Sequence, residues 1–133
     1  MAVDWGARRI GLALSDPTRT IASPLRVIEH QSRALDAAAI VQLANENEVS
    51  LILMGVTYDD QNDLTPSGRS AIRLAEAIHA QGGPEVRAVD EAHSTRTARQ
   101  SRLEMGLPRG KRKGHFDAIA AVLFLQTYLD NNQ

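Results

Sequence analysis

The chain has 133 residues and no cysteine, so neither disulfide bonds within it nor thiolate metal ligands are available. Its 15 Lys and Arg residues nearly balance its 16 Asp and Glu residues, so the net charge indicates no class of partner. The length is enough to bury a core, and we expect one domain over residues 1–133. We also expect a cytoplasmic protein with no membrane partner, because no apolar stretch would cross a bilayer and no signal peptide opens the chain.

The charges are unevenly distributed along the chain. Residues 87–113 are rich in Lys and Arg, whereas residues 45–63 contain Asp and Glu but no basic residue. The first segment is therefore attractive to phosphate and the second is not. A solvated basic face is the simpler explanation of such a run when no motif accompanies it.

The first third of the chain predicts strands. Residues 3–5 and 10–15 are apolar or alternate in polarity, Gly6 marks a turn between them, and residues 20–28 form a third strand-like segment. Strands joined by such short turns favour an antiparallel meander.

The pattern then changes to alternating helices and strands. Ser32 is placed to cap a helix with apolar residues at helical spacing, and residues 49–56 are continuously apolar, as in a strand buried on both faces. A polar loop over residues 57–66, a helix over residues 67–80 and a strand over residues 84–91 follow.

The last third predicts two helices separated by a basic loop. Ser94 or Thr95 caps the first helix, which ends near Gly106, and "GLPRGKRKG" is a loop punctuated by glycine. Asp117 opens a final helix that is apolar on most faces. The order of elements predicts an α/β fold with a five-stranded mixed sheet, in which three antiparallel strands precede alternating helices and strands, and with helices on both faces.

Three acidic residues occupy positions where an isolated charge is costly. Asp4 lies in the first strand, Glu91 at the end of the fifth strand, and Asp117 at the start of a buried helix. These elements can meet at one end of the sheet, and clustered carboxylates repel each other unless a cation lies among them. Oxygen ligands without cysteine indicate Mg²⁺ or Mn²⁺. Two of these acids have a specific simpler explanation: Asp4 can pair with Arg8 or Arg9, and the helix dipole favours an acid such as Asp117 at the N-terminus of a helix.

Three motifs carry a resemblance to a known family. "DWGARRIGLALSD" resembles the pattern D-x-G-x-K-R-I-G-x-A-x-S-D, "VDEAHST" resembles D-E-x-x-S-T, and "KGHFDAIAA" resembles K-x-x-x-D-x-x-A-A. In this order and spacing they resemble the YqgF/RuvX nucleases. Those proteins have a ribonuclease H-like fold and are described as candidate Holliday junction resolvases or as enzymes that process the 5′ end of pre-16S ribosomal RNA.

The resemblance implies that Asp4, Glu91 and Asp117 are the catalytic, metal-binding acids. It also implies that Arg9, Lys113 and the helix that carries Arg96, Arg99 and Arg102 face nucleic acid. We add Arg8, Lys111 and Arg112, which are neighbours of these residues, to the predicted nucleic-acid contacts. The chain departs from the family pattern at Ala7, where Thr is usual, at Ala118, where Ser is usual, and at "GVTYDD", where the family has G-L-P.

We therefore expect a metal-dependent endonuclease that hydrolyses phosphodiester bonds of structured RNA or branched DNA, as a monomer or a homodimer. Two other functions remain open at this point. A nucleic-acid-binding module without catalysis would keep the basic segment, and the altered "GVTYDD" loop favours it. Actin-like ATPases and sugar kinases also begin with a D-x-G hairpin, although they need a second domain to close over nucleotide.

Overall fold

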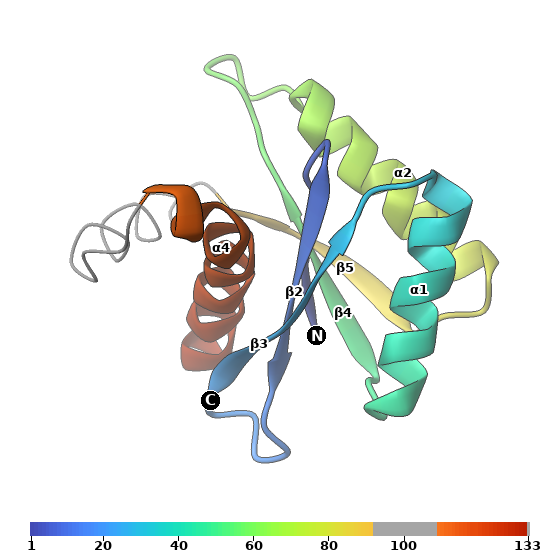
Figure 1. The fold of residues 1–133 in the computed structure, drawn as a ribbon, viewed down its shortest axis with the longest axis vertical. Helices are drawn as coiled ribbons and strands as arrows, with labels where there is room; N and C mark the ends of the chain where they lie inside the picture. The colour runs from blue at the N-terminus through green and yellow to red at the C-terminus, as the bar shows by residue number, and fades with distance from the viewer. Residues whose placement is uncertain (92–108, 133) are drawn as a thin grey trace.

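The computed structural model describes residues 1–91 and 109–132, and over residues 109–117 it describes the backbone alone. The elements, in chain order, are β1 (Ala2–Asp4), β2 (Arg9–Ser15), β3 (Ala22–Glu29), α1 (Arg33–Glu46), β4 (Leu51–Val56), α2 (Pro66–Ala80), β5 (Glu85–Asp90) and α4 (Arg109–Asn131). The strands form one five-stranded sheet of order β3-β2-β1-β4-β5. Helices α1 and α2 cover one face of this sheet and α4 covers the other (Figure 1).

The sheet is mixed, as the sequence predicts. β2 is antiparallel to both β1 and β3, whereas β4 runs parallel to β1 and to β5. Strands β1, β3, β4 and β5 therefore all end at the same side of the sheet, which we call its carboxyl end. Strand ends and helix starts meet there, which is where parallel sheets commonly place their ligands.

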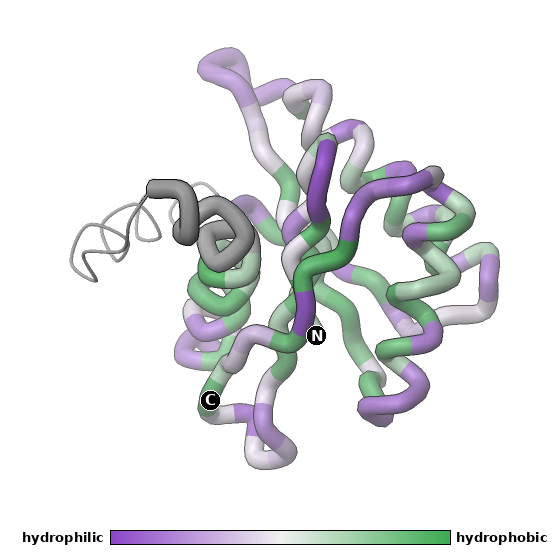
Figure 2. The backbone as a smooth tube through the Cα atoms, viewed as in Figure 1, coloured by the Kyte–Doolittle hydropathy of each residue, from purple (hydrophilic) through white to green (hydrophobic). Residues whose placement is uncertain are grey.

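Strand alternation sends neighbouring side chains into two separate apolar layers. Val3 packs with the layer under α1 and α2, whereas Ala2 packs with Phe124 and Leu125 of α4. In Figure 2 the hydrophobic colour follows the central strands and the described turns of α4, while the loop at residues 57–65 is hydrophilic. β1 is thus buried on both faces, and its last residue reaches the carboxyl end of the sheet.

The predicted helix starts on either side of β4 are close to the observed ones. The Ser32 hydroxyl accepts a hydrogen bond of 3.2 Å from the Leu35 N–H and caps α1. Helix α2 begins at Pro66, where the Thr65 hydroxyl accepts a hydrogen bond of 3.0 Å from the Gly68 N–H. Proline is well suited to the first turn of a helix because its missing N–H needs no partner there.

The prediction for the basic segment is wrong over part of its length. Helix α4 begins at Arg109, not at Asp117, so most of "GLPRGKRKG" is helical rather than a loop. Lys and Arg favour a helix in this segment, whereas Gly110 and Gly114 disfavour one, so its composition does not decide between helix and loop. The helix predicted to begin at Ser94 or Thr95 lies outside the described residues. Within the described parts of the chain, α4 included, no helix is long and apolar enough to cross a membrane.

Candidate active site

Asp4 and Glu91 meet at the carboxyl end of the sheet. Asp4 is the last residue of β1, and Glu91 directly follows β5, where its N–H donates a hydrogen bond of 3.1 Å to the Val56 carbonyl. β4 lies between these two strands, and a side-chain hydrogen bond joins the two carboxyl groups across it. Because Ala2 faces α4, alternation places Asp4 on the same face.

Gly55 of β4 makes room for this contact. A Cβ atom at position 55 would lie 2.3 Å from Glu91 Oε2 and 3.0 Å from Phe124 Cε1 of α4. Any side chain at this position would therefore push the Glu91 carboxyl group away. The same distances show that Glu91 packs on the α4 face of the sheet, beside Phe124.

The surroundings of Glu91 disfavour its negative charge. Burial raises the pKa of the Glu91 carboxyl group, the hydrogen bond with Asp4 acts in the opposite direction, and the nearby charge of Asp90 raises the pKa further. The Oε2 atom of Glu91 is buried. Two acids in contact, one of them desolvated, form an oxygen donor set that suits a hard divalent cation, because the cation would offset both the repulsion and the burial.

Position 117 belongs to α4, but its side chain lies outside the described part of the structure. The position is four residues before Ala121 and seven before Phe124, so its backbone is on the helix face that packs against the sheet. Among the side chains that the structure describes, no group of three His, Asp or Glu residues is placed to hold a metal ion. Asp117 as a third acid thus stays a prediction.

The predicted nucleic-acid contacts are only partly described. Arg8 is exposed and Arg9 half-buried, and both lie beside the turn from β1 to β2 at the carboxyl end. Gly6 allows that turn, because a Cβ there would lie 2.5 Å from the Arg9 carbonyl oxygen. The remaining basic residues are not described at side-chain level: Arg96, Arg99 and Arg102 lie outside the described residues, and Lys111, Arg112 and Lys113 belong to the first turns of α4, where only the backbone is described.

The segment predicted as a polar loop after β4 is an ordered hairpin. Tyr58 and Leu64 form an antiparallel bridge, and the hydroxyl groups of Thr57 and Thr65 are hydrogen-bonded. The Asp59 carboxylate closes the tip by accepting backbone hydrogen bonds at 2.9 and 3.0 Å. This hairpin, residues 57–65, projects beyond the sheet between β4 and α2 (Figure 1). No alternating pattern in the sequence predicts this hairpin, because it contains a single bridge.

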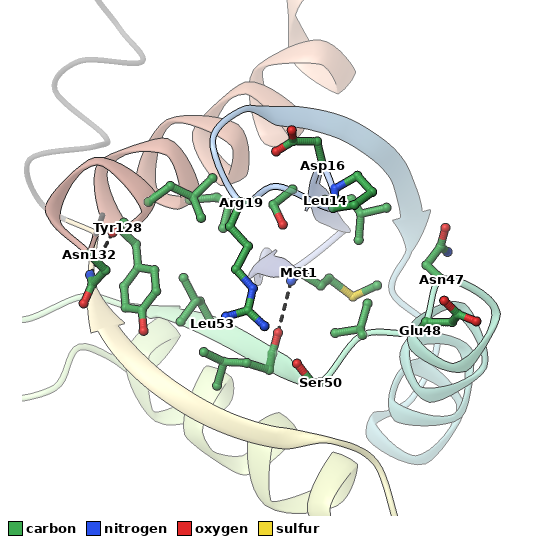
Figure 3. A pocket seen from close by; sticks show the side chains of 16 residues that line it. Met1, Leu14, Asp16, Arg19, Asn47, Glu48, Ser50, Leu53, Tyr128 and Asn132 are labelled. Carbon is green, nitrogen blue, oxygen red and sulfur yellow. Dashed lines mark hydrogen bonds between the residues drawn. The ribbon is translucent and has the colours of Figure 1, made fainter.

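A cavity lies at the opposite end of the sheet from Asp4 and Glu91. It measures about 690 Å³ and is lined by residues that include Met1, Arg19, Leu51 and Tyr128. Figure 3 shows Met1, Arg19 and Tyr128 converging on it from the start of the chain, the β2–β3 turn and α4. At its rim the Met1 amino group donates a hydrogen bond of 3.1 Å to the Leu51 carbonyl. Asp4 and Glu91 do not line this cavity.

Comparison with known proteins assigns the family. A family model described as RuvX, Holliday junction resolvase, matches residues 1–131. The chain belongs to the RuvX family. This membership confirms the family inferred from the three motifs and makes the chain an enzyme of the nuclease class, a hydrolase with a nucleic-acid substrate.

Individual relatives of this RuvX chain agree with that assignment. A protein of Thermoanaerobacter pseudethanolicus is 35% identical over 134 residues, which cover 100% of this chain and 96% of the relative. A Clostridioides difficile protein is 34% identical over 98% of this chain and 92% of its own length. Both are named as candidate pre-16S rRNA nucleases.

Solved structures confirm the fold of the RuvX chain. RuvC of Thermus thermophilus, solved in complex with a Holliday junction substrate, has a TM-score of 0.57 at 15% identity, and covers 98% of this chain and 92% of its own. A second structure of Thermus thermophilus RuvC has a TM-score of 0.54 at 17% identity, over 98% and 93% of the two chains. The ribonuclease H-like fold implied by the motifs is therefore confirmed.

Proposed function

We propose that this chain is a metal-dependent endonuclease whose catalytic acids are Asp4, Glu91 and Asp117. The observation that supports the proposal most strongly is the hydrogen-bonded pair of Asp4 and Glu91 on the face covered by α4. Such a pair has little value for stability, since two adjacent carboxyl groups disfavour each other's ionisation. Perturbed carboxyl groups of this kind are typical of functional sites.

The role of each residue follows from its position. Asp4 and Glu91 would hold a divalent cation, Mg²⁺ or Mn²⁺, with Asp117 as a third oxygen ligand. When bound, such a cation stabilises the attacking and leaving oxygens of a phosphodiester undergoing hydrolysis. Gly55 and Phe124 position the Glu91 carboxyl group and keep bulk water from its buried side. The exposed Arg8 and its neighbour Arg9 would bind backbone phosphates beside the acids.

For the substrate, we propose the 5′ end of a ribosomal RNA precursor first and a Holliday junction second. The relatives that are about one-third identical over the full chain carry the first name, and the family description carries the second. RNA processing requires one active site, so a monomer suffices, whereas a junction with two cleavage points requires a symmetric dimer. Either substrate would place the enzyme in the cytoplasm.

The proposal is tested by cleavage of two labelled substrates in parallel, a precursor-like RNA with a 5′ extension and a four-way DNA junction. Each is incubated with Mg²⁺, with Mn²⁺ and with a chelator. We expect cleavage that needs the cation and that falls on the order of 100-fold or more in Asp4→Asn and Glu91→Gln. The matched control is Asp130→Asn, an exposed carboxylate in the last turn of α4.

Two outcomes would contradict the proposal in different ways. Undiminished cleavage by Asp4→Asn would show that the acids are wrongly assigned. Binding of both substrates without cleavage by the parent protein would favour the non-catalytic binding module. The family match gives no support to the third alternative, an actin-like nucleotide-binding fragment.

A further inference from the structure

A small cavity opens at the carboxyl end of the sheet, on the face opposite the acids. Its volume is about 190 Å³, and its walls come from Trp5, from the residues that join β3 to α1, from the first turn of α1, and from Ser70 and Leu74 of α2. Trp5 directly follows Asp4, and alternation along β1 turns its side chain toward α1 and α2. A strand of nucleic acid held at Asp4 would therefore pass next to this cavity.

The most unusual wall of the cavity is a buried carboxylate that holds a histidine. Asp36, in the first turn of α1, is only 2% exposed. One of its oxygens is hydrogen-bonded to His30 Nδ1, and the other accepts a hydrogen bond of 3.0 Å from the Gln31 N–H. A carboxylate only accepts, so Nδ1 carries the hydrogen and Nε2 is the ring nitrogen left for a ligand. The His30 side chain is 32% exposed.

Trp5 supplies an aromatic wall beside this histidine. The two ring centres are 6.0 Å apart with an interplanar angle of 67°, an edge-to-face contact. Trp5 also packs against the buried layer under α1 and α2, while it remains half-exposed. The ring is thus fixed in place, which lowers the entropy cost of stacking a ligand on it.

The size and the lining of the cavity select the ligand. Its volume is below the roughly 300–1,000 Å³ of sites that enclose a drug-sized molecule, so it suits one ring system rather than a whole nucleotide. Asp36 and Arg33 line the cavity with opposite formal charges, so no net charge draws a phosphate group into it. The remaining walls offer an aromatic face at Trp5, an apolar side chain at Leu74 and hydrogen-bonding groups at His30, Ser32 and Ser70. This combination is the one that binds unstacked bases in single-stranded nucleic acid.

We propose that the cavity between Trp5 and the His30–Asp36 pair is a subsite for one unpaired nucleobase of the substrate strand. The base would stack on Trp5, with Nε2 of His30 hydrogen-bonded to its edge. Asp36 acts through His30 as a positioning residue. This inference rests on the proposed function, because it needs a nucleic-acid strand at Asp4.

The test compares two RNA hairpins with the same stem, one blunt and one with a short unpaired 5′ extension. Binding is measured in chelator, so that cleavage does not interfere. Trp5 is the only tryptophan in the chain, so its fluorescence reports directly on stacking. We expect the parent protein to prefer the extended hairpin and Trp5 fluorescence to be quenched by it alone.

Two variants separate the subsite from general folding effects. Trp5→Leu removes the stacking face and should reduce the preference by about five- to 150-fold. His30→Asn keeps a donor near the place of Nδ1 but removes Nε2, and should reduce the preference with unchanged melting temperature. The matched control is His79→Asn, in the last turn of α2, which should retain the full preference. If Trp5→Leu does not fold, His30→Asn decides.

The outcomes distinguish this subsite from the proposed nuclease activity. Equal binding of both hairpins by the parent protein, or a preference retained by His30→Asn, would overturn the subsite. If the parent protein still cleaves and Asp4→Asn does not, the proposed nuclease activity is supported although the base subsite is not. A preference that depends on Trp5 and His30 but is not accompanied by cleavage would support the subsite and contradict the nuclease.

Discussion

At the scale of single residues, Gly55 is the most informative position for the acid site. A Cβ atom added at Gly55 would lie 2.3 Å from Glu91 Oε2. The Glu91 carboxyl group would therefore have to move. The atom that must yield is the end of a flexible side chain, so we expect Gly55→Ala to fold with a loss of about 1–3 kcal/mol. Cleavage should fall by at least about tenfold, because Glu91 no longer meets Asp4.

Gly82 provides the matched control for this substitution. It has a φ angle of +77°, and an added Cβ there would have no neighbour within 4 Å. Gly82→Ala should therefore cost about 1 kcal/mol of stability through backbone strain alone, with the cleavage rate unchanged. Equal activities of Gly55→Ala and the parent protein would show that the close approach has no role in positioning Glu91.

At the scale of elements, Thr65 joins the hairpin at residues 57–65 to α2. Its hydroxyl group caps the helix through the Gly68 N–H and is hydrogen-bonded to Thr57, and its own N–H donates a hydrogen bond of 3.1 Å to the Thr57 carbonyl. We expect Thr65→Ala to lower the free energy of unfolding by about 1 kcal/mol. Thr65→Ser keeps the hydroxyl group and should recover most of that loss in urea titrations. Equal losses for the two variants would contradict the capping role.

The turn from β2 to β3 depends on the charge of Asp16. Hydrogen bonds from the Thr18 hydroxyl and from the N–H groups of Ile21 and Thr20 lower the pKa of Asp16 below its ordinary value of 3.8. A carboxyl group with a lowered pKa in the folded state stabilises the fold above pH 3.8, and this stabilisation disappears as the pH falls through the folded value.

We therefore expect Asp16→Asn to melt at a lower temperature than the parent protein at neutral pH, with the difference closing in acid. The difference should be small, because Asp16 is exposed to solvent. Thr18→Val removes one donor and should show part of the same effect. A melting difference that persists unchanged into strong acid would rule out the charge of Asp16 as its cause.

The sequence predicts these elements unevenly, for physical reasons. The apolar run before Gly55 and the D-x-G strand are strong local patterns, and the parallel pairing of β1 with β4 follows from chain order, so the meeting of Asp4 and Glu91 is predictable. The start of α4 is not, because Gly110 and Gly114 in a basic run have the appearance of a loop. Local composition does not show whether a glycine lies within a helix or in a loop.

The site details that the sequence does not predict depend on how the elements turn and pack in the folded chain. The clearance at Gly55 exists only when β5 is in register and α4 is packed on the sheet. The pair of His30 and Asp36 forms because the end of β3 turns directly into α1, and an Asp in the first turn of a helix is ordinarily a solvent-exposed favourable charge. The alternation of side chains along β1 is the one sequence signal that places Trp5 and Asp4 on opposite faces of the sheet.

At the scale of the whole molecule, the sheet separates the two proposed sites, which share its carboxyl end. The acids lie on the face of α4, and the cavity at Trp5 lies on the face of α1 and α2. β1 connects the two directly, because Asp4 and Trp5 are consecutive. A strand crossing this end would thus be held on one side by its base and cleaved on the other at its backbone.

Binding of a divalent cation at the acids should raise the stability of the whole fold. A ligand that binds only the folded state at 100 times its dissociation constant adds about 2.7 kcal/mol, which corresponds to roughly 10 °C in melting temperature for a chain of this size. We expect Mn²⁺ or Mg²⁺ to produce such a rise in the parent protein and in Asp130→Asn. Asp4→Asn and Glu91→Gln should show little or none.

The direction of the change in melting temperature can also be predicted for Glu91→Gln in the absence of the cation. Glu91→Gln removes one of two adjacent carboxyl groups and a group whose charge is disfavoured by burial. In chelator it should therefore melt at or above the temperature of the parent protein, even though it no longer responds to Mn²⁺. A lower melting temperature in chelator would mean that the pair of Asp4 and Glu91 stabilises the fold itself. An unchanged response of Glu91→Gln to the cation would place the metal away from these acids.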